Sequence, residues 1–216
     1  MEKKLCIAGL ICLATVLGCE KRQDAATDLE APAFSGNAVE ETAMADVKEK
    51  RRPSHADFQQ GFNLYGQKKY DEAAEFIRQG NASLKGELSN VQGDLKQDAV
   101  QAVREITLLV GKVKDGKLES PQALQEPLSR AQRVVARNYF AHVQKNAKTQ
   151  PADEMAYQVD LGLQALDNSF AYGNTQARAG MQPLIEETRQ LVQDPKSLNR
   201  DQVAAQLQKL TAGLPQ

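Results

Sequence analysis

The sequence of 216 residues has no tryptophan, and its aromatic side chains are limited to six phenylalanines and five tyrosines. Its three cysteines, Cys6, Cys12 and Cys19, all stand near the start of the chain. Beyond position 19 the chain therefore has no cysteine for a disulfide, a thiol nucleophile or a cysteine-ligated metal. Only two histidines, His55 and His142, are present, which further limits metal binding.

Neither sign of charge prevails. Lys and Arg number 27, Asp and Glu number 28, and the formal net charge is −1. Nucleic-acid-binding domains usually carry a strongly basic face. We therefore expect no nucleic-acid partner.

Motifs of several enzyme and cofactor classes are also missing. The sequence has no His-x-x-x-His or Glu-x-x-His pair, no Gly-x-Ser-x-Gly and no phosphate-binding Gly-x-x-x-x-Gly-Lys-Ser/Thr. His142 lies on an apolar stripe, where we expect a satisfied core or boundary residue. We predict no catalytic residue, no cofactor and no metal, so the protein is not expected to be an enzyme.

The chain begins with a short charged segment, Met1–Lys4, followed by an apolar run, Leu5–Leu17. At about 1.5 Å per residue this run is roughly 20 Å long as a helix, too short for a bilayer core of about 30 Å. A charged start, a short apolar middle and a small residue before a cleavage point are the three parts of a secretory signal. We predict that residues 1–18 are a signal peptide.

The run closes on Val16-Leu17-Gly18-Cys19, which resembles the lipobox of bacterial lipoproteins. The resemblance implies that Cys19 is lipidated, that cleavage occurs before it, and that acyl chains hold the protein in the cell envelope. Glu20 follows, and since an aspartate there commonly retains lipoproteins at the inner membrane, the resemblance favours the periplasmic face of the outer membrane. Cleavage without lipid, or a cytoplasmic protein with an accidental apolar start, are the alternatives.

Residues 20–52 contain one aromatic side chain, Phe34, and scattered charges. Such a segment cannot bury enough apolar surface to offset the entropy of ordering it, so we predict a disordered tether. As a coil it reaches about 30 Å from the membrane. A short helix over residues 39–50 and a contact of the basic residues 48–52 with anionic lipid are left open.

Residues 53–213 are rich in Ala, Gln, Leu, Lys and Glu, which favour helices. Apolar positions recur close to every 3.6 residues, and turn or stop signals separate them into about five helices, two of them long. The expected ranges begin at Ser54 and then cover residues 70–114, 120–148, 152–193 and 199–213. Short connections favour antiparallel neighbours, so we predict an all-α fold, an elongated, staggered helical bundle.

Capping signals refine these ends. Ser54 is the expected cap of the first helix, and Asn199 the expected cap of the last. Pro127 should either kink the third helix or mark its true start. Gly80, Gly86 and Gly93 weaken the predicted helix over residues 70–114, and a break near Gly80–Gly86 is the alternative to one continuous helix.

Four aromatic residues at the start of the bundle, Phe58, Phe62, Tyr65 and Tyr70, form a candidate partner-binding groove, with core packing as the alternative. The segment around Gly61, Tyr70 and Ala73 is similar to one tetratricopeptide helical hairpin. No second copy follows at the repeat spacing, and solenoids need about three. We therefore expect an ordinary hairpin with the same packing.

These features predict a membrane-anchored envelope lipoprotein whose bundle is a non-enzymatic protein-interaction or structural module. Its partners would be the membrane, through lipid on Cys19, and an unidentified protein. The alternative is a periplasmic bundle that binds a small molecule or lipid, as a carrier or stress-response protein.

Overall fold

The computed structural model describes residues 53–173 and 175–214. The predicted signal peptide over residues 1–18, the lipidation site Cys19 and the predicted tether over residues 20–52 lie outside these described residues. The boundaries proposed for them therefore stay predictions.

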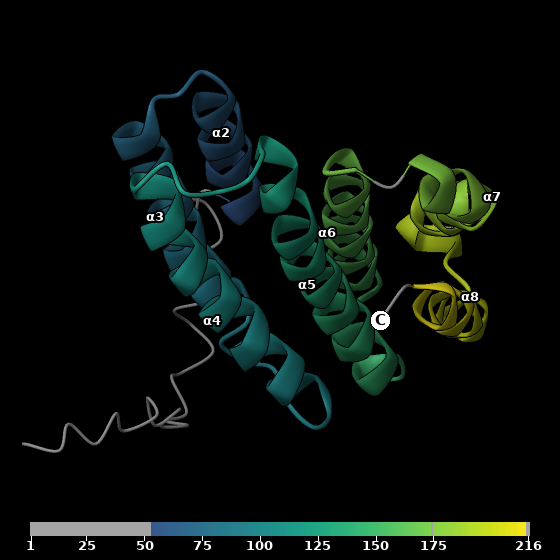
Figure 1. Cartoon of the computed structure of the whole chain (residues 1–216). Coiled ribbons are helices and arrows are strands. Elements are labelled where there is room, and N and C mark those ends of the chain that lie inside the picture. The colour runs from purple at the N-terminus through teal and green to yellow at the C-terminus, as the bar shows by residue number, and fades with distance from the viewer. Residues whose placement is uncertain (1–52, 174, 215–216) are drawn as a thin grey trace, which may run out of the picture. The chain divides into compact units, whose positions relative to one another are not determined.

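The described residues form an all-α bundle, shown in Figure 1. Within them the structure has seven α-helices and two short 3₁₀ helices, which are α2 (Ser54–Gly66), α3 (Tyr70–Glu87), α4 (Leu95–Lys114), η2 (Pro121–Leu124), α5 (Gln125–Asn146), α6 (Ala152–Ala171), α7 (Thr175–Val192), η3 (Pro195–Ser197) and α8 (Arg200–Gly213). The predicted fold class is confirmed, although the number of helices exceeds the predicted five.

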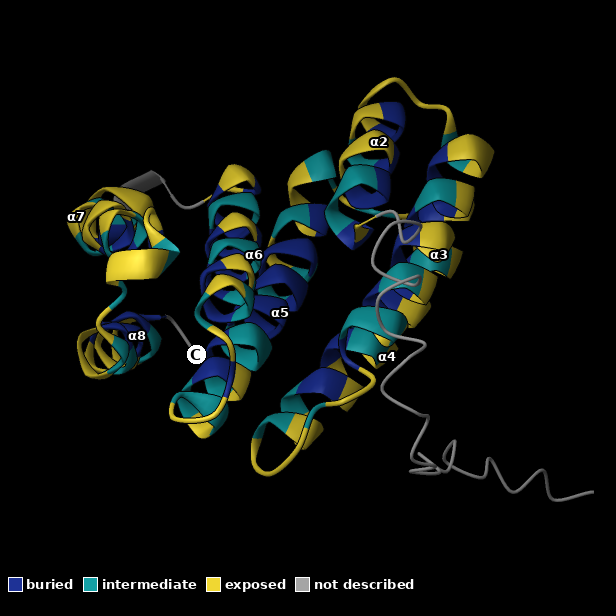
Figure 2. Cartoon of the chain, turned by 180° about the vertical axis from the view of Figure 1, so that it is seen from behind, coloured by how far each residue is buried: buried dark blue, intermediate teal, exposed yellow. Residues whose placement is uncertain are grey.

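Each α-helix packs against the next one along the chain, and α5 also contacts α8. Helix α5 is the most continuously buried element, because every residue from Ala131 to Ala136 is buried. Figure 2 shows its dark blue turns between α4 and α6. The core is therefore organised around α5, which packs against α4, α6 and α8.

The prediction of one continuous helix over residues 70–114 is wrong. The chain leaves α3 after Glu87 and starts α4 at Leu95. Gly93 has φ +63°, a left-handed conformation that glycine adopts without steric cost. The amide of Asn81 on α3 donates to Thr107 on α4 at 2.9 Å, so α4 folds back along α3. Gly80 and Gly86, near which the break was expected, both remain helical, and the chain turns instead at Gly93, the third glycine expected to weaken the helix.

The predicted helix over residues 152–193 is also divided. Helix α6 ends at Ala171, Gly173 has φ +145°, and α7 begins at Thr175. The apolar spacing continues across both breaks because each pair of helices faces the same core. A regular spacing of apolar residues therefore does not distinguish one long helix from two helices joined by a turn.

Three terminal signals had different outcomes. Asn199 caps α8, since its side chain accepts from the backbone N–H of Gln202 at 3.1 Å, as predicted. Ser54 does not cap α2; Pro53 takes that position, and the Ser54 side chain bonds elsewhere. Pro127 stands in the first turn of α5, so it marks the true start of that helix and does not kink it.

Candidate functional site

The predicted lipidation site, Cys19, has no place in the described residues and stays a prediction. Among the described helices, none combines the length and the apolar composition that a bilayer-spanning helix needs. The candidate sites that can be built from side chains therefore belong to the bundle.

Of the four aromatic residues predicted as a possible groove, three lie along α2 and the fourth, Tyr70, begins α3. Phe58 is 0% exposed and its ring packs directly on Gly80, where an added Cβ would lie 2.5 Å from the ring. Tyr65 is buried and Phe62 and Tyr70 are partly buried. The buried Phe58 is a core residue and offers no surface to a partner.

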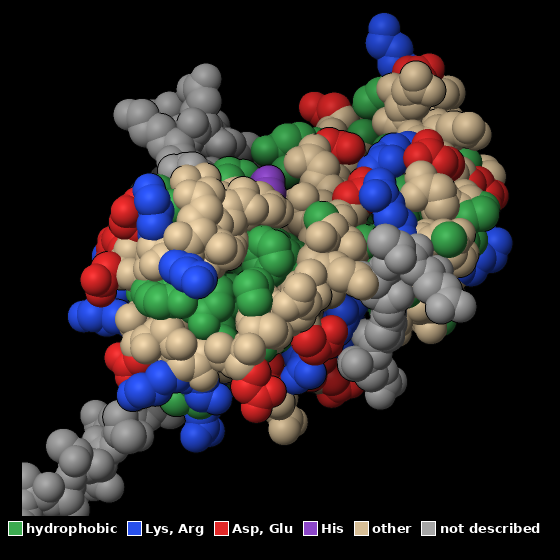
Figure 3. Space-filling view, turned by 45° about the horizontal axis from the view of Figure 1, so that its top comes forward, with side chains coloured by type: hydrophobic (Ala, Val, Ile, Leu, Met, Phe, Trp, Pro, Cys, Tyr) green, Lys and Arg blue, Asp and Glu red, His purple; other side chains and the backbone are tan. Residues whose placement is uncertain are grey.

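The other three aromatic residues make ring contacts, and Tyr65 also bonds the segment after α4. Tyr65 and Tyr70 have ring centroids 5.1 Å apart, and the Tyr65 hydroxyl accepts from the backbone N–H of Leu118 at 3.2 Å. Phe62 meets Tyr172 edge-on at 6.3 Å. Figure 3, which brings the upper end of Figure 1 forward, shows hydrophobic side chains gathered over the α2–α3 side of the molecule.

A buried polar junction joins α2, α3 and α5. Glu87 accepts from the backbone N–H of Ser54 at 3.0 Å and from its hydroxyl at 2.6 Å. Gln132 on α5 donates to the same hydroxyl at 2.9 Å, and Asn138 donates to the Glu87 carbonyl at 3.2 Å. Burial raises the pKa of the Glu87 carboxyl, and the two hydrogen bonds from Ser54 oppose that rise.

The junction has the residue types of a hydroxyl nucleophile and a carboxylate base, but not their accessibility. Ser54 is 0% exposed, so its hydroxyl cannot meet a substrate. Nearby Tyr139 is partly buried, and this burial raises its pKa to about 12 and keeps its phenol protonated at neutral pH. The arrangement therefore holds three helices together. No local sequence pattern indicates it, because its residues are far apart along the chain.

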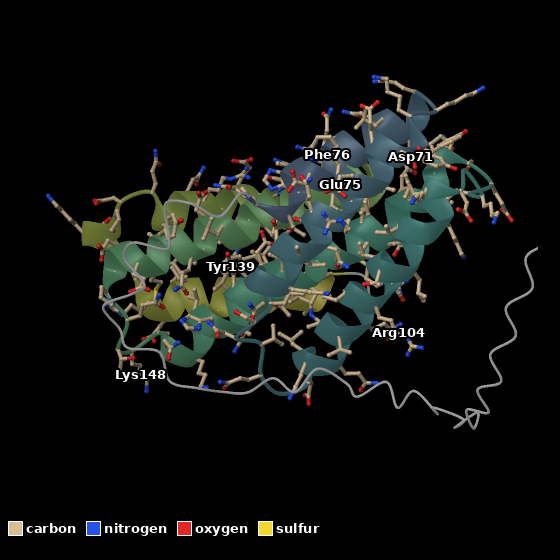
Figure 4. The ribbon with its side chains drawn as sticks, turned by 90° about the vertical axis from the view of Figure 1, so that its left-hand side faces the viewer. Asp71, Glu75, Phe76, Arg104, Tyr139 and Lys148 are labelled. Carbon is tan, nitrogen blue, oxygen red and sulfur yellow. The ribbon has the colours of Figure 1, made fainter. Side chains whose placement is uncertain are left out.

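The outward face of α4 is the second candidate site. Val100 is 49% exposed and Leu108 is 63% exposed, and Arg104 lies one turn from each. At about 100° per residue, Arg104 points about 180° away from the mean direction of the five buried α4 side chains, which are Ala99, Ala102, Ile106, Leu109 and Val113. Figure 4 shows Arg104 extending from α4 away from the neighbouring ribbons.

An open surface hollow follows this face of α4. Its described lining comes from α4 and the two residues before it, and includes Gly93, Gln97, Val100, Arg104 and Leu108. Among the described residues, the side chains that line it all come from this one segment, so the hollow is open along the helix, a shape that suits an added helix. The sequence-based search missed this face, although the alternation of cation and aliphatic residue at four-residue spacing could have indicated it.

Two ion pairs fix the inner side of α4 against α5. Arg130 contacts Glu105 at 2.9 Å, and Arg137 contacts Asp98 at 2.7 Å. The two acidic residues are seven positions apart on α4, and the two arginines are seven positions apart on α5. Since the two helices run in opposite directions, both pairs form in the same register of α4 against α5. They also pair Asp98 and Glu105, two acidic side chains of α4, with arginines of α5.

Neither histidine belongs to a cluster. His142 is exposed, with a ring nitrogen 3.0 Å from the amide nitrogen of Asn146, so the prediction that it lies in the core or at its boundary is wrong. Half-burial lowers the pKa of His55. In the described part of the chain, no group of three or more His, Cys, Asp or Glu side chains is placed to hold a metal ion.

Comparisons of the chain with protein families, with characterised proteins and with solved structures find no match.

Proposed function

We propose that the protein is a lipid-anchored envelope protein whose helical bundle is a non-enzymatic protein-interaction module. The interaction half of this proposal is carried by the outward face of α4. On this face Val100 and Leu108 are exposed one helical turn on either side of the exposed Arg104. Aliphatic and arginine side chains side by side are typical of protein interfaces.

The anchoring half is supported by the sequence of the first nineteen residues. The apolar run is too short to span a bilayer, and it ends on a cysteine in a lipobox-like setting. Several acyl chains, at about 0.8 kcal/mol for each buried CH₂, would give a stable attachment. The bundle needs no membrane-spanning helix of its own under this proposal.

The non-enzymatic character is supported by the chemistry of the described side chains. The Ser54 hydroxyl, which donates to the Glu87 carboxylate, is fully buried. The described lining of the hollow along α4 consists of amide, charged and aliphatic groups of α4 and of the two residues before it. It gives no support to the small-molecule alternative, which requires an enclosed apolar cavity.

The anchor is tested by Cys19→Ser in the full chain. We expect loss of radiolabelled acyl incorporation and release of the protein from the membrane fraction. Cys12→Ser is the matched control, because it removes a thiol from the same segment and should leave acylation and fractionation unchanged. Continued acylation of the Cys19→Ser protein would contradict the proposal.

A further inference from the structure

Five residues of α4, spaced four apart, form a ridge that alternates cation and aliphatic side chain: Lys96, Val100, Arg104, Leu108 and Lys112. We call these five residues the α4 ridge. At about 1.5 Å per residue it extends about 24 Å along the helix. Every one of its side chains is exposed. Its length is that of a typical helix–helix contact of four to five turns.

The α4 ridge concentrates the exposed aliphatic surface of the bundle. The described residues include three exposed large hydrophobic side chains, Val100, Leu108 and Tyr157, and two of them belong to the ridge. The other faces of α4 are covered by α3 and α5. A surface of this kind, with a cation at its centre, an aliphatic side chain on either side and a lysine at each end, is complementary to a helix face that carries both apolar and acidic residues.

The charge of the α4 ridge is positive. Asp98 and Glu105, the acidic residues nearest to it in the helix body, are engaged by Arg137 and Arg130 of α5. Arg104 makes no ion pair within the described part of the chain, and Lys112 and Lys114 add to the positive charge of the last turn. Charge complementarity therefore requires an acidic partner.

Two other occupants fit less well. An antiparallel contact between two copies centred on Arg104 would oppose Arg104 to Arg104 and Lys96 to Lys112, and such like-charge pairs are unfavourable. A membrane surface is bound by helices with a continuous apolar face, often with aromatic side chains. In the α4 ridge a cation separates the two aliphatic residues, and no aromatic residue is present.

We propose that the α4 ridge binds an acidic amphipathic helix of a partner protein. The apolar residues of that helix would lie against Val100 and Leu108, and its carboxylates would face Arg104 and Lys112. This inference rests on the proposed interaction function and names the chemistry of the partner. Arg104, at the centre of the contact, carries the largest share of the binding because a guanidinium binds a carboxylate through two hydrogen bonds.

The test places a photo-crosslinking amino acid at Leu108 in the full chain, in cells that make the protein naturally. A second protein carries it at Gln190, an exposed position of α7, as the control. Crosslinked segments are identified by mass spectrometry. We expect the Leu108 protein to give an adduct with a segment of another protein that has acidic and apolar residues at helical spacing, and the Gln190 protein to lack it.

Charge variants add a quantitative arm. Arg104→Glu should lower the yield of the Leu108 adduct by about tenfold. Arg178→Glu, which reverses an exposed arginine of α7, should change that yield by less than about twofold. Both substitutions are on the surface, and thermal unfolding followed by circular dichroism checks that the bundle is intact.

Each other outcome overturns the inference. An adduct of Leu108 with lipid assigns the α4 ridge to the membrane, and an adduct with a second copy of this chain assigns it to self-association. No adduct, or an adduct that Arg104→Glu leaves unchanged, shows that the ridge does not recognise an acidic helix. If Gln190 gives a protein adduct while Leu108 does not, the interaction function stands and only the site assigned to it falls.

Discussion

The carboxylate of Glu87, in the last turn of α3, accepts hydrogen bonds from both the backbone N–H and the hydroxyl of Ser54, in the first turn of α2. The first N–H groups of a helix have no partner within the helix, so a hydrogen-bond acceptor beside them is stabilising. Glu87, 33 positions away in the sequence, therefore caps the first N–H of α2 in place of a neighbouring residue. This explains why the local capping signal at Ser54 failed.

This relationship predicts a pH dependence of stability. Burial raises the pKa of Glu87 above its ordinary value of 4.5, so the folded protein binds this proton more tightly than the unfolded chain. The resulting stabilisation is present below pH 4.5 and is lost as the pH rises through the raised pKa. We expect the free energy of unfolding of the wild type, minus that of Glu87→Gln, to decrease over this range.

The measurement is urea unfolding at a series of pH values. Glu72→Gln, on the exposed side of the same helix, controls for the loss of one carboxyl group. A difference between the wild type and Glu87→Gln that increases with pH would contradict the assignment, since it would mean that the fold favours the ionised carboxylate.

Close packing at Gly162 predicts a second effect on stability. A Cβ added there would lie 2.4 Å from the ring of Phe140, which is fully buried on α5. Overpacking of this kind costs about 1–3 kcal/mol, which exceeds or offsets the gain of up to about 1 kcal/mol from replacing a helical glycine with alanine. We expect Gly162→Ala to destabilise the bundle, measured by urea unfolding.

Gly180→Ala on α7 is the matched control, because nothing lies within 4 Å of the added Cβ. It should stabilise the protein by up to about 1 kcal/mol. Combining Gly162→Ala with Phe140→Leu should cost less than the sum of the two single substitutions, since a shorter side chain relieves the overlap. Strict additivity would show that the ring does not carry the cost.

Most of the secondary structure could be predicted from the sequence, because apolar spacing and stop signals are local. Asp115-Gly116, Pro151 and Pro195 all follow or precede helices at the expected places. Chain reversals inside a continuous apolar phase could not be predicted. At Gly93 the phase continues because α3 and α4 bury their stripes in one core, and only the backbone conformation shows the turn.

The candidate sites were less predictable for a similar reason. The Ser54–Glu87–Gln132 junction joins residues from three helices, and no pattern in the sequence connects them. The exposure of Val100 and Leu108 depends on which face of α4 the neighbouring helices cover. In contrast, Phe58 and Tyr65 lie on the buried stripe that the spacing indicated, so for these two residues core packing could be anticipated.

The two ion pairs between α4 and α5 should contribute little to stability. The four side chains of these pairs are between 29% and 44% exposed. Pairs in such positions are typically worth about 0.2–1 kcal/mol. A double-mutant cycle with Asp98→Asn and Arg137→Gln should give a coupling in this range that decreases with added salt. A larger coupling that is insensitive to salt would mean that the pair is shielded from solvent.

Gly93→Ala tests the break between α3 and α4 through the sign of its effect. If residues 70–114 formed one helix, alanine would stabilise it by up to about 1 kcal/mol relative to glycine. In the observed turn Gly93 has φ +63°, and a residue with a Cβ pays about 1–2 kcal/mol there. Nothing lies within 4 Å of the added Cβ, so the cost comes from the backbone alone. We therefore expect a loss of stability.

Gly93→Asn should lose less, because asparagine tolerates the left-handed region. Gly111→Ala, in the interior of α4 with the same open surroundings, should gain stability. If Gly93→Ala and Gly111→Ala both stabilise the protein, the chain does not turn at Gly93, and α3 and α4 are one helix.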